Sequence, residues 1–400
     1  MTLCSPRSPV AARGATLSRT VHLHVGVAKS GTTYLQRILH ENRALLRDHG
    51  VLYPGRRRAA HFLASMDLRG TGFAGHEYPA ADGAWGRLVS AVDDFDGVGL
   101  ISHETLARSN RAAVRKAVES FATDDVRVVV TARDLARQVP SVWQETIKNR
   151  GDRTYGEFLD EVFRSPDGER RKGGFWLAQN LPALATRWME VVGPERFTLV
   201  TVPPSGAAPD ELWRRYCAAV GIPDADYRLE VEGSNPSLGV VESELLRRVN
   251  PKLGDLTWPE YETRIKRAFA ERELATFSRS DRLVVPADLH DAVRRAGDDA
   301  ISFFADAGCR VVGDLEDLRP QLSDAPSRTP EEVSDQDLLD LALGLVARSA
   351  SRPAVPRPAG GTDRSVLDGA VAVRVREVVR RGTRRAAGRV REVVRRRRDG

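Results

Sequence analysis

The sequence predicts an α/β protein in which a parallel sheet is flanked by helices on both faces. Short runs rich in β-branched residues, such as Gly97–Ser102 and Val126–Ala132, have the composition of buried parallel strands. Segments with apolar residues at helical spacing alternate with these runs along the chain. A glycine-containing turn separates the first strand from the first helix, an order typical of α/β domains.

The first elements follow from periodicity. A strand is predicted over Thr20–Gly26, where small polar and apolar residues alternate, and the helix after it carries Leu35, Ile38 and Leu39 on one stripe. The stretch Val51–Asp96 is rich in Gly, Ala and His and lacks clear periodicity. We therefore expect a loop-rich insertion over the sheet there.

Later elements continue the alternation. Asn110–Phe121 predicts a crossover helix, with Asn110 as its N-cap. A helix over Gly174–Val192, a strand over Arg196–Val202 and a helix over Asp210–Val220 follow.

Composition divides the chain into four expected parts. These are a disordered leader (1–18), an α/β domain (19–319), linkers with a short helix (320–361) and a basic tail (362–400). The linkers are rich in Pro, Ser, Gly and Ala and surround an amphipathic helix over Gln336–Ala347. From Val371 onward twelve arginines stand against three acidic residues, a balance of +9 that leaves −3 for the rest of a chain of net charge +6. Valines line the other side of this segment, so the tail is expected to be disordered or an amphipathic helix.

Composition also excludes several classes of protein. The cysteines Cys4, Cys217 and Cys309 are odd in number and lack metal-ligand spacing, which argues against a disulfide framework or a zinc site. No apolar run is long enough for a transmembrane helix, and the first residues lack the apolar core of a signal peptide. We therefore expect a cytoplasmic protein.

The turn from Gly26 to Thr33 has the residues of an anion-binding loop. Backbone N–H groups there and the positive end of the following helix suit a phosphate or an isostere. The ordinary phosphate loop places lysine directly after its second glycine. Here Thr32 occupies that position, and Lys29 stands two residues before Gly31. The lysine therefore approaches the anion from the loop, not from the helix.

A second motif follows the strand Val126–Ala132. Arg133 comes directly after this strand, and Ser141 stands eight residues later on the next helix. A guanidinium can donate two parallel charge-assisted hydrogen bonds to a terminal phosphate. Pro140 would be tolerated in the first turn of that helix. Because arginine is common in this chain, the prediction depends on the spacing of the pair downstream of the Lys29 loop.

Together these motifs resemble those of the sulfotransferases that use 3′-phosphoadenosine-5′-phosphosulfate (PAPS), with an overall look closest to the bacterial members. The resemblance rests on Lys29-Ser30-Gly31-Thr32-Thr33-Tyr34, Arg133 and Ser141, and covers roughly Arg19 to Gly313. It implies a P-loop-like sheet flanked by helices. It also implies transfer of a sulfuryl group from PAPS to a hydroxyl or amine.

The resemblance gives each residue an expected role. Lys29 would contact the bridging oxygen and the 5′-phosphosulfate, and Ser30, Gly31, Thr32 and Thr33 would bind the same group. Tyr34 would lie near the adenine, while Arg133 and Ser141 would hold the 3′-phosphate. Many eukaryotic members carry a late Arg-Lys-Gly signature. Arg171-Lys172-Gly173 has that composition but precedes a core helix and strand, so we expect a loop there.

Two residues are candidates for the base that removes the acceptor proton, a contribution of roughly 10²–10⁴-fold. His103 follows the strand Gly97–Ser102, as the catalytic histidine of the family follows a strand. Glu104 is adjacent, and some glycan sulfotransferases use glutamate. Each also has a structural interpretation: His103 would tie the strand end, and Glu104 would cap a helix or pair with arginine. No metal is expected, because Lys29 and loop amides could stabilise the less charged sulfuryl group in place of magnesium.

Two other functions fit parts of the sequence. A P-loop kinase-like phosphotransferase would leave Arg133 and Ser141 without a partner and would lack its lysine at position 32. A non-catalytic nucleotide-fold binding protein would act through the basic tail. A valine-faced arginine helix fits an anionic membrane surface better than nucleic acid, since it offers no aromatic or amide side chains; a solvated tail is equally consistent. The acceptor, whether glycan, glycolipid or small metabolite, would be selected by the variable segments 51–96 and 151–174.

Overall fold

The computed structural model describes residues 19–72, 76–164, 174–230, 237–277, 280–323 and 327–351. The chain divides into two units, Met1–Ser334 and Asp335–Gly400. The first unit has the predicted α/β fold, a parallel sheet flanked by helices. In the second unit the structure describes helix α16 (Asp335–Ala350), which contains the helix predicted over Gln336–Ala347.

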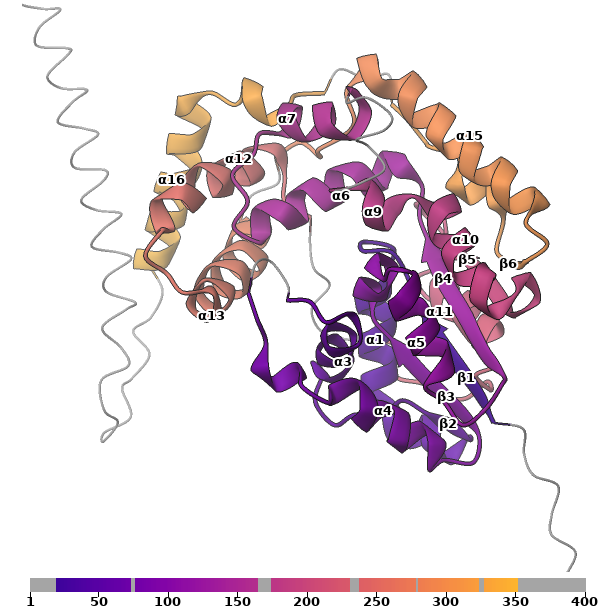
Figure 1. Cartoon of the computed structure of the whole chain (residues 1–400). Helices are drawn as coiled ribbons and strands as arrows, with labels where there is room; N and C mark the ends of the chain where they lie inside the picture. The colour runs from indigo at the N-terminus through magenta and orange to yellow at the C-terminus, as the bar shows by residue number, and fades with distance from the viewer. Residues whose placement is uncertain are drawn as a thin grey trace, which may run out of the picture. The chain divides into compact units, whose positions relative to one another are not determined.

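The sheet has six parallel strands in the order β2-β3-β1-β4-β5-β6 (Figure 1). The strands are β1 (Thr20–His24), β2 (Val51–Leu52), β3 (Val98–Ser102), β4 (Val126–Ala132), β5 (Phe197–Thr201) and β6 (Arg310–Val312). The chain crosses from one side of β1 to the other between β3 and β4. The carboxyl ends of these three strands therefore lie where parallel α/β sheets commonly bind ligands.

Helices cover both faces of this sheet. The α-helices of the unit are α1 (Thr32–Glu41), α2 (Arg43–Asp48), α3 (Ala60–Arg69), α4 (Ala84–Asp93), α5 (Arg111–Glu119), α6 (Leu135–Lys148), α7 (Tyr155–Leu159), α9 (Trp176–Gln179), α10 (Leu181–Val192), α11 (Glu211–Val220), α12 (Val240–Val249), α13 (Trp258–Tyr261), α14 (Ala275–Phe277) and α15 (His290–Asp306). Short 3₁₀ turns are η1 (Pro79–Ala81), η2 (Glu104–Arg108), η4 (Pro194–Arg196), η5 (Asn250–Leu253), η7 (Ala287–Leu289), η8 (Leu315–Leu318) and η9 (Pro330–Glu332), and the π-helical segments are η3 (Asp160–Arg164) and η6 (Glu262–Leu274).

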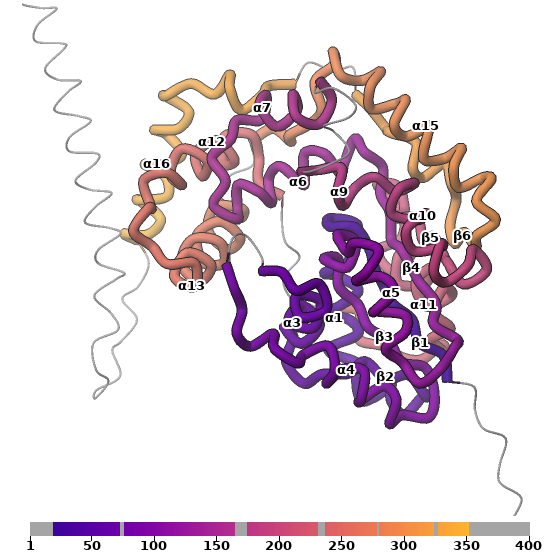
Figure 2. The backbone as a smooth tube through the Cα atoms, viewed as in Figure 1, coloured from indigo at the N-terminus to yellow at the C-terminus, as the bar shows by residue number. Residues whose placement is uncertain are grey.

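Strand β4 is buried on both faces, as its composition predicts. Val128 and Val130 pack into a core shared with Trp188 of α10, whereas Val129 packs into a second core with Leu35 of α1. The sheet thus separates two apolar layers. Figure 2 shows how α15 leads the chain back to the sheet, where β6 pairs with β5.

The loop-rich insertion predicted over Val51–Asp96 is wrong. This segment holds β2, α3 and α4, and Leu68 and Trp85 belong to the core. In α3 the apolar period is interrupted because a polar residue fills a core position: His61 is buried and its Nε2 lies 2.8 Å from the Pro54 carbonyl oxygen.

Helix ends follow their capping residues. Asn110 caps α5 as predicted, its side chain accepting a hydrogen bond from the Ala113 amide at 2.9 Å. The helix predicted over Gly174–Val192 is divided at Asn180, whose side chain caps α10. Pro140 lies inside α6, beyond its first turn, so its predicted position in that turn is wrong.

Several predictions fall outside the described residues. They concern the leader (1–18), the run Arg171-Lys172-Gly173 and the basic tail (362–400). The boundaries expected at 319 and 361 stay predictions.

Candidate functional site

Three predicted site segments meet at one edge of the sheet. The loop 25–31 follows β1, His103 follows β3 and Arg133 follows β4. The His103 amide donates to the His24 carbonyl oxygen at 3.2 Å, and Arg133 Nη1 donates to the Lys29 carbonyl oxygen at 3.3 Å. Because these strands are adjacent and parallel, their carboxyl ends bring together residues more than a hundred positions apart.

The loop after β1 has an unusual backbone. Lys29 has φ 69° and Gly31 has φ 83°, both in the left-handed region that side chains other than glycine rarely adopt. At Gly31 a Cβ would also come 2.4 Å from Leu212 Cδ2, so glycine is favoured there by both the backbone and the packing. Thr32, the first residue of α1, is buried, and Thr33 is exposed.

Neighbouring helices hold the carbonyl groups of this loop. The Ala28 carbonyl oxygen accepts hydrogen bonds from Gln138 of α6 and from Gln179 of α9, while Arg133 bonds that of Lys29. With the carbonyls engaged, the first N–H groups of α1, which have no intrahelical partner, remain for an anion. The helix dipole adds positive potential at the same point. The loop can therefore bind a phosphate-like group.

A cluster of ammonium groups surrounds Glu145 of α6. Lys29 Nζ lies 3.1 Å from Glu145 Oε2, and Lys266 Nζ of η6 lies 2.7 Å from Glu145 Oε1 and 2.7 Å from Asn149 Oδ1. Burial alone would raise the pKa of Glu145, but Lys29 and Lys266 outweigh it and hold that pKa well below its usual range. Burial, with help from the Lys29 ammonium, lowers the pKa of Lys148 to about 8. Three of the six lysines in the chain thus gather at the loop.

Arg133 is a buried cation beside the loop. Burial, and next the neighbouring Arg137, lowers the pKa of its guanidinium to about 10. Its Nε is buried without a hydrogen-bond partner among the described residues. Asp134 caps α6 and pairs with Arg137 instead. Arg133 therefore keeps donors available for a ligand anion.

The other predicted nucleotide contacts lie on the helices that leave this edge. The Ser141 hydroxyl donates to the Arg137 carbonyl oxygen at 2.8 Å, one turn back in α6. The half-buried Tyr34 of α1 donates from its hydroxyl to the Pro209 carbonyl oxygen at 3.4 Å, just before α11. Tyr34 thus faces the segment between β5 and α11.

His103 begins η2, and two contacts compete for its Nδ1. The Thr105 amide lies 3.2 Å away and needs a lone pair on Nδ1, whereas the Thr105 hydroxyl lies 2.7 Å away. The Thr105 hydroxyl also lies 2.5 Å from the Ser65 hydroxyl, which donates to the Phe62 carbonyl oxygen at 2.7 Å. A proton on Nδ1 would satisfy the hydroxyl contact and would leave the lone pair of His103 on Nε2. Burial lowers the pKa of His103, so the ring is neutral at pH 7.

Glu104 is held by the first helix. Its Oε2 accepts a hydrogen bond from Gln36 Nε2 at 3.1 Å and lies 3.9 Å from His103 Nδ1. Gln36 also donates to the Ser102 carbonyl oxygen at 3.4 Å. Glu104 therefore bridges the end of β3 to α1, next to the anion loop.

Several residues of this site carry no recognisable sequence signal. Gln138, Gln179 and Glu145 belong to helices in which other side chains form the core, and no short motif marks them. Lys266 contacts Glu145 from 121 positions away. The i, i+4 pair Glu145 and Asn149, joined at 3.3 Å, is the one local pattern that could have drawn attention to them.

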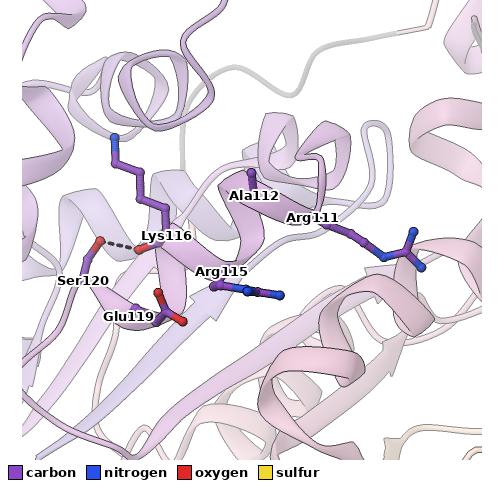
Figure 3. A pocket seen from close by; sticks show the side chains of 6 residues that line it. All are labelled: Arg111, Ala112, Arg115, Lys116, Glu119 and Ser120. Carbon is purple, nitrogen blue, oxygen red and sulfur yellow. Dashed lines mark hydrogen bonds between the residues drawn. The ribbon is translucent and has the colours of Figure 1, made fainter.

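A separate hollow of about 630 Å³ lies along α5 (Figure 3). It is lined by Arg111, Ala112, Arg115, Lys116, Glu119 and Ser120. Arg111 already makes two hydrogen bonds of 2.8 Å to Glu190. Since all its lining comes from one helix and the residue after it, the hollow is an open surface and not a second site.

Among the described residues, no three His, Cys, Asp or Glu side chains are placed to hold a metal ion. None of the helices described there combines the length and apolar composition needed to cross a bilayer.

No protein-family model matches the chain, and no curated protein matches it. Among solved structures, the chain is similar to a sulfotransferase from Alicyclobacillus acidocaldarius, at 19% sequence identity and a TM-score of 0.39. The match covers 54% of this chain and 87% of that protein.

Proposed function

We propose that the chain is a sulfotransferase that moves a sulfuryl group from PAPS to a hydroxyl or amine of a glycan, glycolipid or small metabolite. One observation supports this most directly. The loop that carries Lys29 and the guanidinium of Arg133 lie together, joined by the bond from Arg133 Nη1 to the Lys29 carbonyl oxygen. A nucleotide with anionic groups at both the 5′ and the 3′ position of its ribose would bind the loop and Arg133 simultaneously.

The donor would be held by its two anionic groups. The N–H groups at the start of α1 and the Lys29 ammonium would bind the 5′-phosphosulfate. Arg133, buried and without a direct carboxylate partner among the described residues, would bind the 3′-phosphate, and Ser141 would turn its hydroxyl from Arg137 toward it. Tyr34 would lie beside the adenine.

Transfer would proceed by in-line displacement. The acceptor oxygen or nitrogen forms a bond to sulfur while the bond from sulfur to the bridging oxygen breaks, and adenosine 3′,5′-bisphosphate leaves. The acceptor proton passes to His103 Nε2 in the tautomer with Nδ1 protonated, or to Glu104 if the glutamate is the base. Lys29 stabilises the negative charge that develops on the leaving bridging oxygen.

The charges at the site fit this transfer without a metal. Lys29, Lys148 and Lys266 supply three ammonium groups, and Glu145 offsets one of them. A sulfuryl group carries less charge than a phosphoryl group, so ammonium groups and loop amides can stabilise the transition state. A P-loop kinase-like phosphotransferase would instead leave Arg133 without its phosphate.

Calorimetry tests the proposal. Adenosine 3′,5′-bisphosphate should bind far more tightly than AMP or ATP in the absence of magnesium. Arg133→Ala should lose this preference, at about 1.5–3 kcal/mol for a hydrogen bond to a charged group. Arg127→Ala is the matched control, because Arg127 is exposed on the same strand and pairs with Asp125. Equal affinity for AMP and the bisphosphate would refute the assignment.

The proposed location is cytoplasmic, with the basic tail reaching an anionic membrane surface. The tail lies outside the described residues, so this part rests on its composition. Arginines near an anionic leaflet contribute about 1 kcal/mol each. Lipid-linked acceptors on the inner membrane face would then be within reach.

A further inference from the structure

A chain of hydrogen bonds runs through the sheet directly under the anion loop. It joins the side chains of Ser102 at the end of β3, His24 at the end of β1, Thr131 in β4 and Ser30 in the loop; we call it the hydroxyl–imidazole chain. Ser102 Oγ lies 2.7 Å from His24 Nδ1, and His24 Nε2 lies 3.1 Å from Thr131 Oγ1. Thr131 Oγ1 lies 2.8 Å from Ser30 Oγ. All four residues have no exposed surface.

The direction of every bond is fixed by one end. The Ser30 hydroxyl donates to the Val27 carbonyl oxygen at 2.6 Å, so its single proton is used. Thr131 must therefore donate to Ser30 and accept from His24 Nε2–H. Burial lowers the pKa of His24 to about 3, so the ring is neutral and its Nδ1 accepts a hydrogen bond from Ser102. The tautomer of His24 with its proton on Nε2 satisfies every hydrogen bond of the hydroxyl–imidazole chain.

Close packing around Gly26 fixes the positions of these side chains. A Cβ on Gly26 would come 2.3 Å from Thr131 Oγ1 and 2.8 Å from His24 Nε2. The backbone of β4 also holds the loop, since the Val27 amide donates to the Thr131 carbonyl oxygen at 3.3 Å. Of the four residues in the hydroxyl–imidazole chain, Ser30 alone lies outside a strand. It stands between Lys29 and Gly31, the two loop residues with positive φ.

We infer that His24 and Thr131 are positioning residues, which hold Ser30 and thereby set the loop backbone, with Lys29 at its edge, in the shape that binds an anion. Ser30 cannot itself reach a ligand through its hydroxyl proton, because that proton already goes to Val27. Its contribution comes instead through the backbone that it anchors. The inference rests on the proposed function only in naming the 5′-phosphosulfate of the donor as the anion.

A pair of substitutions at Thr131 separates positioning from general stability. Thr131→Val removes the hydroxyl but keeps a branched side chain of similar size, whereas Thr131→Ser keeps the hydroxyl. Thr131→Val should weaken binding of adenosine 3′,5′-bisphosphate by about 3- to 10-fold, the effect of one hydrogen bond, and Thr131→Ser should not. Adenosine 3′-monophosphate lacks the group that the loop binds, so its affinity should be the same in both variants. If Thr131→Val weakened the binding of both ligands equally, the substitution would have disturbed the fold in general, and the inference would be overturned.

Nuclear magnetic resonance (NMR) gives readouts that need no ligand. With [¹⁵N]lysine, the six lysines give six backbone amide signals, one of them from Lys29. Thr131→Val should move the Lys29 signal and leave the other lysine signals in place, which also reports an intact fold; Thr131→Ser should move none. An unmoved Lys29 signal in Thr131→Val would overturn the inference.

The ring of His24 gives a second ligand-free readout. With [¹⁵N]histidine, His24 should show a proton on Nε2 and none on Nδ1 down to about pH 4, because its pKa is held near 3. A proton on His24 Nδ1 at neutral pH would also overturn the inference. If the wild-type protein failed to bind the bisphosphate, the proposed function would fall, while these two signals would still decide the role of His24 and Thr131.

Discussion

Replacing Glu145 with glutamine tests the ammonium cluster. The substitution keeps the shape of the side chain but removes the charge that pairs with Lys29 at 3.1 Å and with Lys266 at 2.7 Å. Removing one partner of a buried ion pair costs about 3–5 kcal/mol. The side chains of Lys29 and Glu145 are each 23% exposed, and water offsets part of the loss. We therefore expect the free energy of unfolding to fall by about 2–3 kcal/mol at pH 7.

The pH dependence of this difference follows from the sign of the pKa shift. The pKa of Glu145 is lower in the folded protein than in the unfolded chain, where it is about 4.3. Its stabilising contribution is complete above the unfolded value and is lost as the pH falls toward the folded one. The gap between wild type and Glu145→Gln should thus be constant near neutrality and should narrow from about pH 5 downward.

Urea unfolding at several pH values measures this gap. Glu41→Gln is a suitable control, since Glu41 pairs with Arg58, whose side chain is 65% exposed, and should change stability by less than about 1 kcal/mol. A loss from Glu145→Gln no larger than that of the control would refute the reasoning. A gap that stayed constant below pH 5 would do so as well.

Three further predictions concern the base, the loop and the tail. His103→Ala should lower kcat by roughly 10²–10⁴-fold while leaving affinity for the bisphosphate nearly unchanged; an inactive Glu104→Ala beside an active His103→Ala would give the role to the glutamate. Gly26→Ala should destabilise the protein by about 1–3 kcal/mol in thermal or urea unfolding, because the added methyl would lie 2.3 Å from Thr131 Oγ1. The full-length protein should co-sediment with anionic vesicles and not with neutral ones, more weakly in high salt. A version ending at Gly361 should stay in solution, and equal pelleting of both would leave the tail without this role.

The sequence predicted the central strands well because each is buried on both faces. Val126–Ala132 is a strand with the predicted bounds, and it is buried except for Arg127. Parallel strands with such composition need no long-range information to be recognised. The helix α3 was missed because its core positions are filled in part by polar residues such as His61, which are satisfied by hydrogen bonds that only the folded chain supplies. Strand β2 has only two residues, too few to show a period.

The candidate site divides in the same way. The loop around Lys29 and the position of Arg133 lie at strand ends, so their meeting follows from strand order. The partners that orient them come from distant segments: Gln179 reaches the Ala28 carbonyl oxygen, and Lys266 reaches Glu145. No local pattern encodes such contacts, because they depend on how α9 and η6 pack against α6.

The left-handed conformation of Lys29 has a consequence for how a ligand is received. Holding a residue other than glycine at φ 69° costs of order 1–3 kcal/mol, and here folding has already met that cost through the bonds to Arg133, Gln138 and Gln179. The loop amides already point toward the anion site before the ligand binds. Binding therefore costs little backbone conformational entropy. Association should then be limited by diffusion and desolvation, with a calorimetric signature dominated by enthalpy. Free and ligand-bound crystals of the protein should show the same loop backbone.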